Sequence, residues 1–231
     1  MGESAIKGFT QVSTPKDVSA PTGYVKALVC IATGFTITGL SFLDPFFGMA
    51  PPFARINRET GFMELATSPR ELFYHDLNAD DAAYWVSQLT PQSLKALAEG
   101  GEHTYTGWKD VPVWFVGTVE DHGFPVMAQR LNVGMARGQG AVVHHTELVS
   151  SHSSFLSMPG EVVEIIMQAV DAVSGKGSSR QVSERKGVAA PAVRLGAPGT
   201  WFRFGLPFLM GRGLGWAIFG FIELTRRVRW M

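Results

Sequence analysis

The fold is decided by two stretches of the sequence, VPVWFVGTVEDHGFPVMAQRL at residues 111–131 and HHTELVSSHSSFLSMPGEVVEII at residues 144–166. Each begins within a segment of strand character, continues into a polar loop and ends in a helical pattern. The two stretches therefore predict two successive strand–loop–helix units. Earlier in the chain, residues 27–32, ALVCIA, form an apolar run without strict alternation, which is typical of a strand that is buried on both faces of a parallel sheet.

The same pattern extends outward along the chain. Strands are expected at residues 24–33, 111–118 and 141–148. Helices are expected at residues 125–137 and 159–173, and the second is strongly amphipathic, with Val162, Ile165, Ile166 and Ala169 on one face. Strands that alternate with helices imply right-handed crossovers and a parallel sheet, whose ligand chemistry lies at the carboxyl ends of its strands. The fold class is therefore α/β.

A helical insert separates the first two strands. Residues 34–70 mix Gly, Pro and aromatics with little periodicity, which predicts loop and short helical turns. Helix signals begin in residues 69–77, and Asn78 is a good N-cap for a helix over residues 79–89. A second short helix is expected to start near residues 90–93.

Bulk composition limits the classes of partner. The 231 residues suffice for one domain with a sizeable core. Lys plus Arg and Asp plus Glu are both 20, so the formal net charge is zero and nucleic acid is not an expected partner. Cys30 is the only cysteine, which excludes an intrachain disulfide. Residues 1–10 lack the basic head and apolar run of a secretory signal, and we expect a cytoplasmic protein.

His144 and His145 are the most obvious candidate metal ligands. They are adjacent within an expected strand, so their side chains point to opposite faces and cannot both bind one ion. The sequence also has no Cys-x-x-Cys motif. We therefore predict no metal site and no cofactor.

A carboxylate and a histidine follow two consecutive expected strands. Asp121 lies just past the strand at residues 111–118, and His152 lies just past the strand at residues 141–148. A hydrolytic triad needs such a pair, because the histidine deprotonates a serine while the carboxylate fixes the histidine tautomer and stabilises its charged form. Spacing alone leaves a plainer alternative open, in which Asp121 caps a turn and His152 is a surface histidine.

The same residues carry a resemblance to the α/β-hydrolase superfamily, to the branch with plant methyl-esterases, hydroxynitrile lyases and fungal hydrolases. Asp121 stands ahead of Pro125 as the acid does in that branch. His152 begins HSSFLSMPGE, which is similar to the histidine motif except that Ser154 replaces the usual proline. The resemblance implies that His152 is the general base and Asp121 its orienting acid, with Glu120 as the alternative acid.

The middle of the chain extends this resemblance. Residues 71–93, ELFYHDLNADDAAYWVSQLTPQS, are similar to the cap segment of the fungal members. The resemblance implies a cap over about residues 40–105, with Tyr74, Asp76 and Trp85 facing a pocket for a small apolar ester-like substrate. Ordinary helix packing is the alternative for each of these side chains.

The nucleophile is the missing part of the pattern. In the family it lies in a G-x-S-x-G pentapeptide, and this sequence holds none. The opening GESAIKGF resembles the helix after that turn, so we expect residues 1–173 to be a partial α/β-hydrolase domain, truncated or degenerate. Ser4 lies near the expected turn but has no preceding strand to hold it. The resemblance implies a carboxylic-ester hydrolase with little activity, and the alternative is a non-catalytic, membrane-associated binding or accessory protein.

The C-terminal part changes character. Residues 174–199 are rich in small, polar and basic residues and predict a linker, and residues 200–231 form an apolar tail. Within the tail, residues 204–222 carry one charge, Arg212, and fit a membrane-spanning or interfacial helix. Arg212 would cost about 2.5–3.5 kcal/mol at the centre of a span, and five glycines weaken the helix. We expect membrane association through this segment, and the sequence leaves open whether it spans, as it leaves the oligomeric state open.

Overall fold

A four-stranded sheet forms the centre of the computed structural model, which describes residues 2–12, 23–175, 187–194 and 196–228. β1, β5 and β6 run parallel in that order, and β7 pairs antiparallel with β6. The strands are β1 (Leu28–Ile31), β5 (Val113–Thr118), β6 (Val143–Leu148) and β7 (Val188–Ala189). The first three confirm the predicted strands with shorter bounds. The fourth was not predicted and lies within the expected linker.

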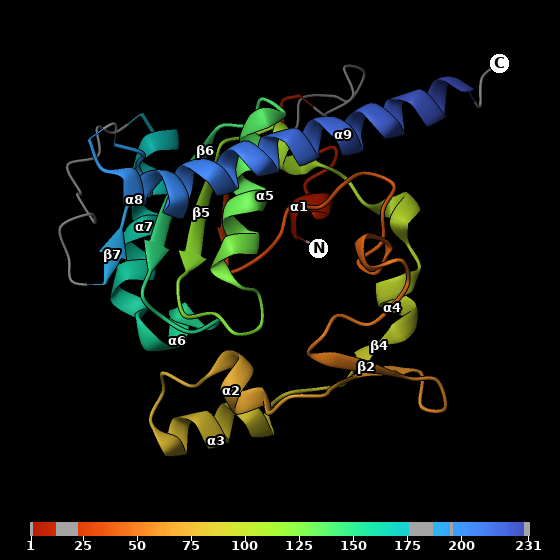
Figure 1. The fold of residues 1–231 in the computed structure, drawn as a ribbon, viewed down its shortest axis with the longest axis vertical. Coiled ribbons are helices and arrows are strands. Elements are labelled where there is room, and N and C mark those ends of the chain that lie inside the picture. Colours follow the sequence, from red (N-terminus) through yellow and green to blue (C-terminus); the bar gives the residue numbers. More distant parts are fainter. Residues whose placement is uncertain (1, 13–22, 176–186, 195, 229–231) are drawn as a thin grey trace.

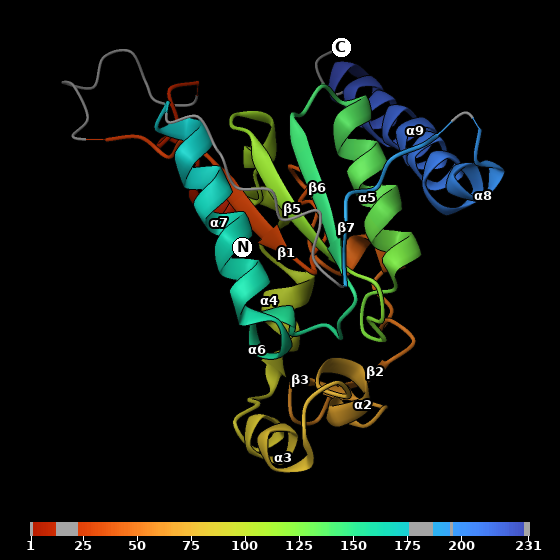
Figure 2. The same ribbon diagram turned by 90° about the vertical axis from the view of Figure 1, so that its left-hand side faces the viewer.

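Helices cover both faces of this sheet (Figure 2). α7 (Pro159–Val173) lies on one face and α5 (Val126–Gly138) on the other. α9 (Leu206–Val228) lies outside α5, so that α5 is packed between the sheet and α9. The predicted order of strand, insert, strand, helix, strand and helix is confirmed.

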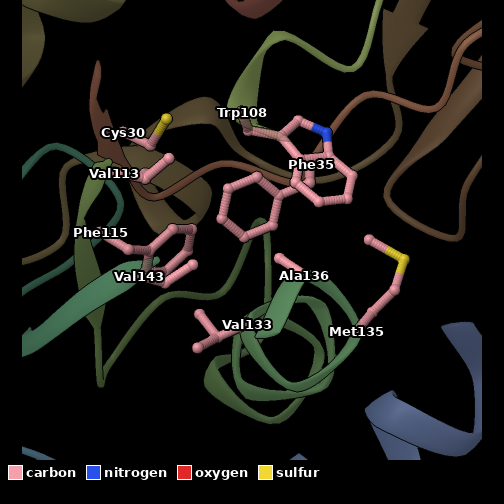
Figure 3. Close-up of a cluster of buried hydrophobic side chains, with 9 residues drawn as sticks. All are labelled: Cys30, Phe35, Trp108, Val113, Phe115, Val133, Met135, Ala136 and Val143. Atoms are coloured by element: carbon pink, nitrogen blue, oxygen red, sulfur yellow. The ribbon is translucent and has the colours of Figure 1, made fainter. Parts of the chain in front are cut away.

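The core between the sheet and α5 combines aromatic and aliphatic side chains (Figure 3). Trp108 and Phe115 are fully buried, and the Phe35 ring centroid lies 5.3 Å from the first and 5.5 Å from the second. Trp108 donates its indole N–H to the Thr36 carbonyl at 2.6 Å, which satisfies its polar edge. The buried cluster consists of Cys30, Phe35, Trp108, Val113, Phe115, Val133, Met135, Ala136 and Val143.

On the opposite face, α7 packs through a narrower apolar stripe than the sequence predicted. Val162, Ile165 and Ala169 are buried against the sheet, as expected. Ile166, expected on the same face, is 37% exposed, because it lies at the edge of that stripe.

The insert between β1 and β5 holds a second sheet, which corrects the expectation of loop and helical turns for residues 34–70. Its three antiparallel strands are β2 (Ala54–Asn57), β3 (Phe62–Leu65) and β4 (Gln92–Ser93). The Asn57 side chain accepts the amides of residues 59 and 60 and so closes the turn between β2 and β3. Gly61 completes the turn at φ +73°, a conformation that suits glycine. A hairpin thus forms from strands too short to show a clear period.

Two helices of the insert begin at polar caps. Asn78 accepts a backbone amide of α3 at 2.9 Å, which confirms the predicted N-cap, and Ser93 accepts one of α4 at 3.4 Å. The helices are α2 (Pro69–Phe73), α3 (Ala79–Ser87) and α4 (Leu94–Ala98). α2 and α3 lie beyond the carboxyl ends of β5 and β6 (Figures 1 and 2). The insert therefore stands at the end of the sheet where Asp121 and His152 follow their strands.

α9 packs closely along α5 through glycines on both helices (Figure 1). A β-carbon at Gly134 of α5 would overlap the backbone of Phe208, and one at Gly211 of α9 would overlap the backbone of α5. Gly138 and Gly215 repeat the close approach one turn further along their helices. In its described part, the expected tail therefore has one face buried against the rest of the protein.

Short elements complete the described chain. They are α1 (Gly2–Ala5), α6 (Ser154–Ser157), α8 (Pro198–Thr200), the 3-10 turns Asp44–Phe46, Gly101–His103 and Gly107–Lys109, and the π-helical turn Trp201–Gly205. α8 and the π-helical turn lead directly into α9. Residues 176–186 of the expected linker lie outside the described residues.

Candidate active site

Two loops meet at the carboxyl ends of β5 and β6. The pairing continues past the strands, because the amide of Val119 donates to Leu148 at 2.9 Å and that of Glu120 donates to Ser150 at 3.1 Å. Parallel strands end at the same edge of a sheet, so the residues that follow them emerge side by side. This geometry brings together two side chains that are 31 residues apart in the sequence.

These side chains are His152 and Asp121. His152 Nδ1 lies 2.8 Å from Asp121 Oδ2. The aspartate side chain is fully buried and the imidazole is 31% exposed. Because an ionised carboxylate only accepts hydrogen bonds, Nδ1 carries the proton and Nε2 keeps its lone pair. No residue in the described ranges forms a hydrogen bond with Nε2. The imidazole is thus oriented as a base with Nε2 as the basic atom.

Four further donors hold the Asp121 carboxylate. Oδ1 accepts the backbone amides of Gly123 at 2.9 Å and Phe124 at 2.7 Å. Oδ2 accepts the Thr118 hydroxyl at 2.7 Å and the Gln129 amide nitrogen at 3.2 Å. A buried carboxylate needs such partners, because an unpaired charge is costly to remove from water. The donors fix both oxygens and so fix the orientation of the imidazole.

Gln129 is a positioning residue that sequence reasoning missed. It is fully buried in the first turns of α5. Its oxygen accepts the Thr118 amide at 3.0 Å, and its nitrogen donates to the Phe124 carbonyl at 2.7 Å and the Thr118 hydroxyl at 2.9 Å. The residue therefore ties the end of β5 to the loop that carries Asp121. The only signal in the sequence is a glutamine at an inward-facing helix position.

The insert contributes Phe73 to the site. Its ring centroid lies 5.2 Å from that of His152. Gly123 lies against the same ring, since a β-carbon there would come within 3.0 Å of it. The Ser151 hydroxyl donates to the Phe73 carbonyl at 2.9 Å, which ties α2 to the loop after β6. An aromatic ring thus covers one side of the imidazole.

Tyr74 and Trp85, the predicted substrate-binding residues, have different surroundings. Tyr74 is 8% exposed and packs edge-on against Phe73 at 6.0 Å, and burial raises the pKa of its phenol. Trp85 is 37% exposed on α3 and contacts the Tyr84 ring at 5.1 Å. No hydrogen bond or ring contact joins Trp85 to His152 within the described residues. The structure therefore brings Tyr74 next to a ring of the site and leaves Trp85 apart from it.

Further contacts join the insert to the loops of the site. The rings of His75 and His122 stack at 4.2 Å. His75 Nε2 lies 2.8 Å from the Glu120 carbonyl, and His122 Nδ1 lies 2.9 Å from a carbonyl of α2. Asp76 Oδ2 accepts the Ser151 amide at 2.8 Å. Burial raises the pKa of the Asp76 carboxyl, but hydrogen bonding from Ser151, Ser157 and its own backbone together more than offsets this and leaves the pKa below its ordinary value. The insert is therefore fixed to both loops.

The alternative acid and the alternative nucleophile do not reach His152. Glu120 is exposed, and only its main chain is bonded at the site. The Ser4 hydroxyl accepts the Tyr105 amide at 3.0 Å. The Tyr105 hydroxyl in turn donates to Asp110 at 2.9 Å, near the amino end of β5. Ser4 is therefore bonded to the segment that precedes β5, and no contact joins it to His152 within the described residues.

His144 and His145 lie on opposite faces of β6, as alternation along a strand requires. His144 stacks on Trp114 at 4.4 Å. His145 is buried, and neither ring nitrogen has a hydrogen-bond partner in the described structure. Burial, followed by the positive charges of Arg137 and Arg130, lowers the pKa of His145 to about 3. Among the described residues, no group of three His, Cys, Asp or Glu side chains could hold a metal ion.

A buried ion pair lies between α5 and β6, close to the start of α9. Arg130 donates Nε and Nη2 to the two oxygens of Glu147 at 2.7 and 2.8 Å. The two side chains are 6% and 0% exposed. The Phe204 ring lies 4.8 Å from the guanidinium, and His145 Nε2 lies 3.7 Å from Glu147 Oε1. The pair serves the packing of these elements and lies apart from His152.

A comparison with protein families identifies the family of this chain. The family model described as "Alpha/beta hydrolase family" matches residues 11–165, more than half of the chain. The chain therefore belongs to the alpha/beta hydrolase family. The predicted fold class, with few parallel strands, flanking helices, a cap insert and an apolar C-terminal helix, is confirmed.

Matches to individual proteins are weaker. The crystal structure of polyneuridine aldehyde esterase is similar at 20% identity and a TM-score of 0.49. The match covers 64% of this chain and 63% of that chain, so the chain spans less than two thirds of its length. No curated protein matches. The family is thus established by the family model, and the activity rests on the site.

Proposed function

We propose that His152 and Asp121 are the base and the acid of an ester-hydrolysing site. The observation that carries this proposal is the 2.8 Å hydrogen bond between His152 Nδ1 and the buried Asp121 carboxylate. In ester hydrolysis, Nε2 takes the proton of the attacking oxygen and returns it to the leaving alkoxide. The carboxylate holds the required tautomer and stabilises the imidazolium that forms in between.

The nucleophile decides how active the chain is. No hydroxyl in the described residues bonds to His152 Nε2, and the sequence has no G-x-S-x-G. We therefore expect the chain by itself to be a weak hydrolase in which water is the attacking oxygen. A serine and a pair of oxyanion donors placed beside His152 by a further segment would complete the site.

The substrate proposed for this site is a small ester with an apolar body. The aromatic ring of Phe73 beside His152 and the buried Tyr74 next to it favour apolar groups over charged ones. Trp85, which is exposed on α3, belongs to the proposal as an outer wall of the substrate pocket. The proposed reaction calls for no cofactor, because His152 serves the proton transfers and water supplies the attacking oxygen.

Two measurements test this proposal. The first is the proton NMR spectrum, in which the bonded Nδ1–H proton of wild type should give a strongly deshielded signal that is absent in His152→Ala and moved in Asp121→Asn. The second is hydrolysis of short-chain p-nitrophenyl esters, with a residual rate above buffer that His152→Ala removes. A Tyr84→Phe variant, changed at an exposed ring of α3, is the control and should match wild type. Ester hydrolysis that survives in His152→Ala would refute the role of the pair.

A second candidate function rests on a separate observation. Residues 198–225 form a 28-residue helical stretch that is long and apolar enough to cross a membrane, and 22% of its apolar window is buried. We propose that the chain is a cytoplasmic protein that associates with a membrane through residues 204–222. Flotation of the purified chain with lipid vesicles tests this, and failure to float would refute it. If the ester assay is negative and flotation is positive, a non-catalytic accessory role is favoured.

A further inference from the structure

The exposed side of α9 is the largest apolar feature left unexplained by the site. Its most exposed apolar side chains, which we call the outer stripe, lie on one face of the helix at a period of 3.6 residues per turn. Each member is at least 49% exposed. The outer stripe consists of Leu206, Leu209, Met210, Leu214, Phe221 and Leu224. It extends for about 27 Å at 1.5 Å per residue.

The opposite side of α9 packs against the rest of the protein. Gly211 and Gly215 pack against α5, and Phe208 packs against His145 with ring centroids 5.9 Å apart. Phe219 likewise packs on Trp108 at 6.2 Å. A helix that crossed a membrane would have to leave these contacts. Its outer stripe would enter the membrane, but so would the glycine face and the Arg212 charge.

The charges of this segment favour lipid over a second copy of the chain. Residues 200–231 contain five arginines and one glutamate. Arg203 and Arg212 are exposed, and Arg212 lies over the Trp216 ring at 4.9 Å, to one side of the outer stripe. Two such helices brought face to face would repel each other, whereas anionic headgroups attract all of the arginines. Exposed tryptophans at 201 and 216 suit the headgroup region of a membrane.

We propose that α9 binds in the plane of a membrane with anionic headgroups, its outer stripe in the lipid and its glycine face still on α5. This inference rests on the membrane association proposed above and adds the orientation of the helix and the class of lipid. Arg212 then needs no place in the hydrocarbon, because its long side chain reaches the headgroups from the flank of the helix. The sheet and the His152 site stay on the aqueous side.

Vesicle flotation of the full chain tests the contact. The probe is a set of vesicles of phosphatidylcholine alone and of phosphatidylcholine with phosphatidylglycerol. We expect binding to the anionic vesicles, weakened by added salt. The double variant Leu209→Glu/Leu214→Glu should lose at least about tenfold in vesicle affinity, because binding scales with the apolar area that enters the lipid. The matched control Val163→Glu/Val170→Glu, which changes exposed apolar residues of α7, should bind like wild type.

Protease protection tests the orientation. A tag added after residue 231 should stay open to protease when the protein is bound to the outside of sealed vesicles. A protected tag would mean that α9 spans, which overturns this inference and leaves membrane association standing. If the chain binds neither kind of vesicle, both this inference and the membrane association proposed above are wrong. A stable dimer that fails to bind vesicles, and that Leu209→Glu/Leu214→Glu separates, would assign the outer stripe to a second copy instead. Unchanged melting of both double variants shows that neither result comes from unfolding.

Discussion

Replacing Arg130 by methionine should strongly lower the free energy of unfolding, although Arg130 lies apart from His152. The change leaves the Glu147 carboxylate fully buried and removes both hydrogen bonds of 2.7 and 2.8 Å that now satisfy it. Breaking a buried pair from one side typically costs about 3–5 kcal/mol, because the remaining charge is left without a partner. For a chain of this size each kcal/mol lowers the melting temperature by roughly 2–4 °C. We therefore expect Arg130→Met to melt about 6–20 °C below wild type.

Two companion variants separate the charge effect from lost packing. The double variant Arg130→Met/Glu147→Met removes both charges and should recover most of the loss, since apolar replacement of a buried pair is often neutral. Arg55→Met breaks the pair with Glu64, whose side chains are 71% and 32% exposed, and should leave the free energy of unfolding nearly unchanged, because solvent screens an exposed pair. Thermal and urea unfolding give the free energies. The reasoning fails if Arg130→Met costs no more than Arg55→Met, or if the double variant is no more stable than the single one.

Three further predictions concern other parts of the fold. Burial lowers the pKa of His145 in the folded protein to about 3, whereas a histidine in the unfolded chain has a pKa of about 6.5. Between these two values the unfolded chain binds a proton that the folded chain does not bind, so the free energy of unfolding decreases as the pH falls. His145→Leu should flatten that loss, by up to about 1 kcal/mol per pH unit in urea titrations. Gly211→Leu should force α9 off α5 because of the overlap with its backbone, and limited proteolysis should then release the C-terminal segment while wild type resists. Gln129→Leu should cost about 1–3 kcal/mol in unfolding experiments by leaving the Thr118 amide unpaired, and it should broaden the deshielded His152 proton signal.

The sheet and the acid–base pair were accessible from the sequence because each depends on local signals. The alternation of strand and helix segments predicted β5 and β6 as parallel strands, which place the following loops at one edge of the sheet. Spacing thus made Asp121 and His152 candidates, and the resemblance was needed to prefer an acid–base pair over a turn cap and a surface histidine. The choice of Asp121 over Glu120 needed the resemblance as well, and the structure brings Asp121 to the imidazole.

Features that depend on partners remote in sequence were not accessible. The role of Gln129 rests on contacts with the end of β5, and a lone glutamine on a helix carries no sign of them. The two residues of β7 are too few to show a period, so their segment looked like a linker. The glycines of α9 looked like weaknesses of an isolated helix, yet Gly211 and Gly215 are what allow its close approach to α5. Their meaning appears only when both helices are in view.

The position of α9 affects the order in which parts of this protein become packed during synthesis. Phe204, in the π-helical turn that leads into α9, lies over Arg130, and Phe208 packs on His145, so a segment that is synthesised after α5 and β6 covers side chains of both. Until it arrives, the ion pair is hydrated and the glycine groove of α5 is bare. Water therefore leaves Arg130 and Glu147 only after this segment has been synthesised. In a nascent chain that ends before residue 204, the ion pair would still be hydrated. A chain whose α9 has not yet docked on α5 exposes both the glycine face and the outer stripe of that helix. At this stage a chaperone or a lipid bilayer would have the largest apolar surface to bind.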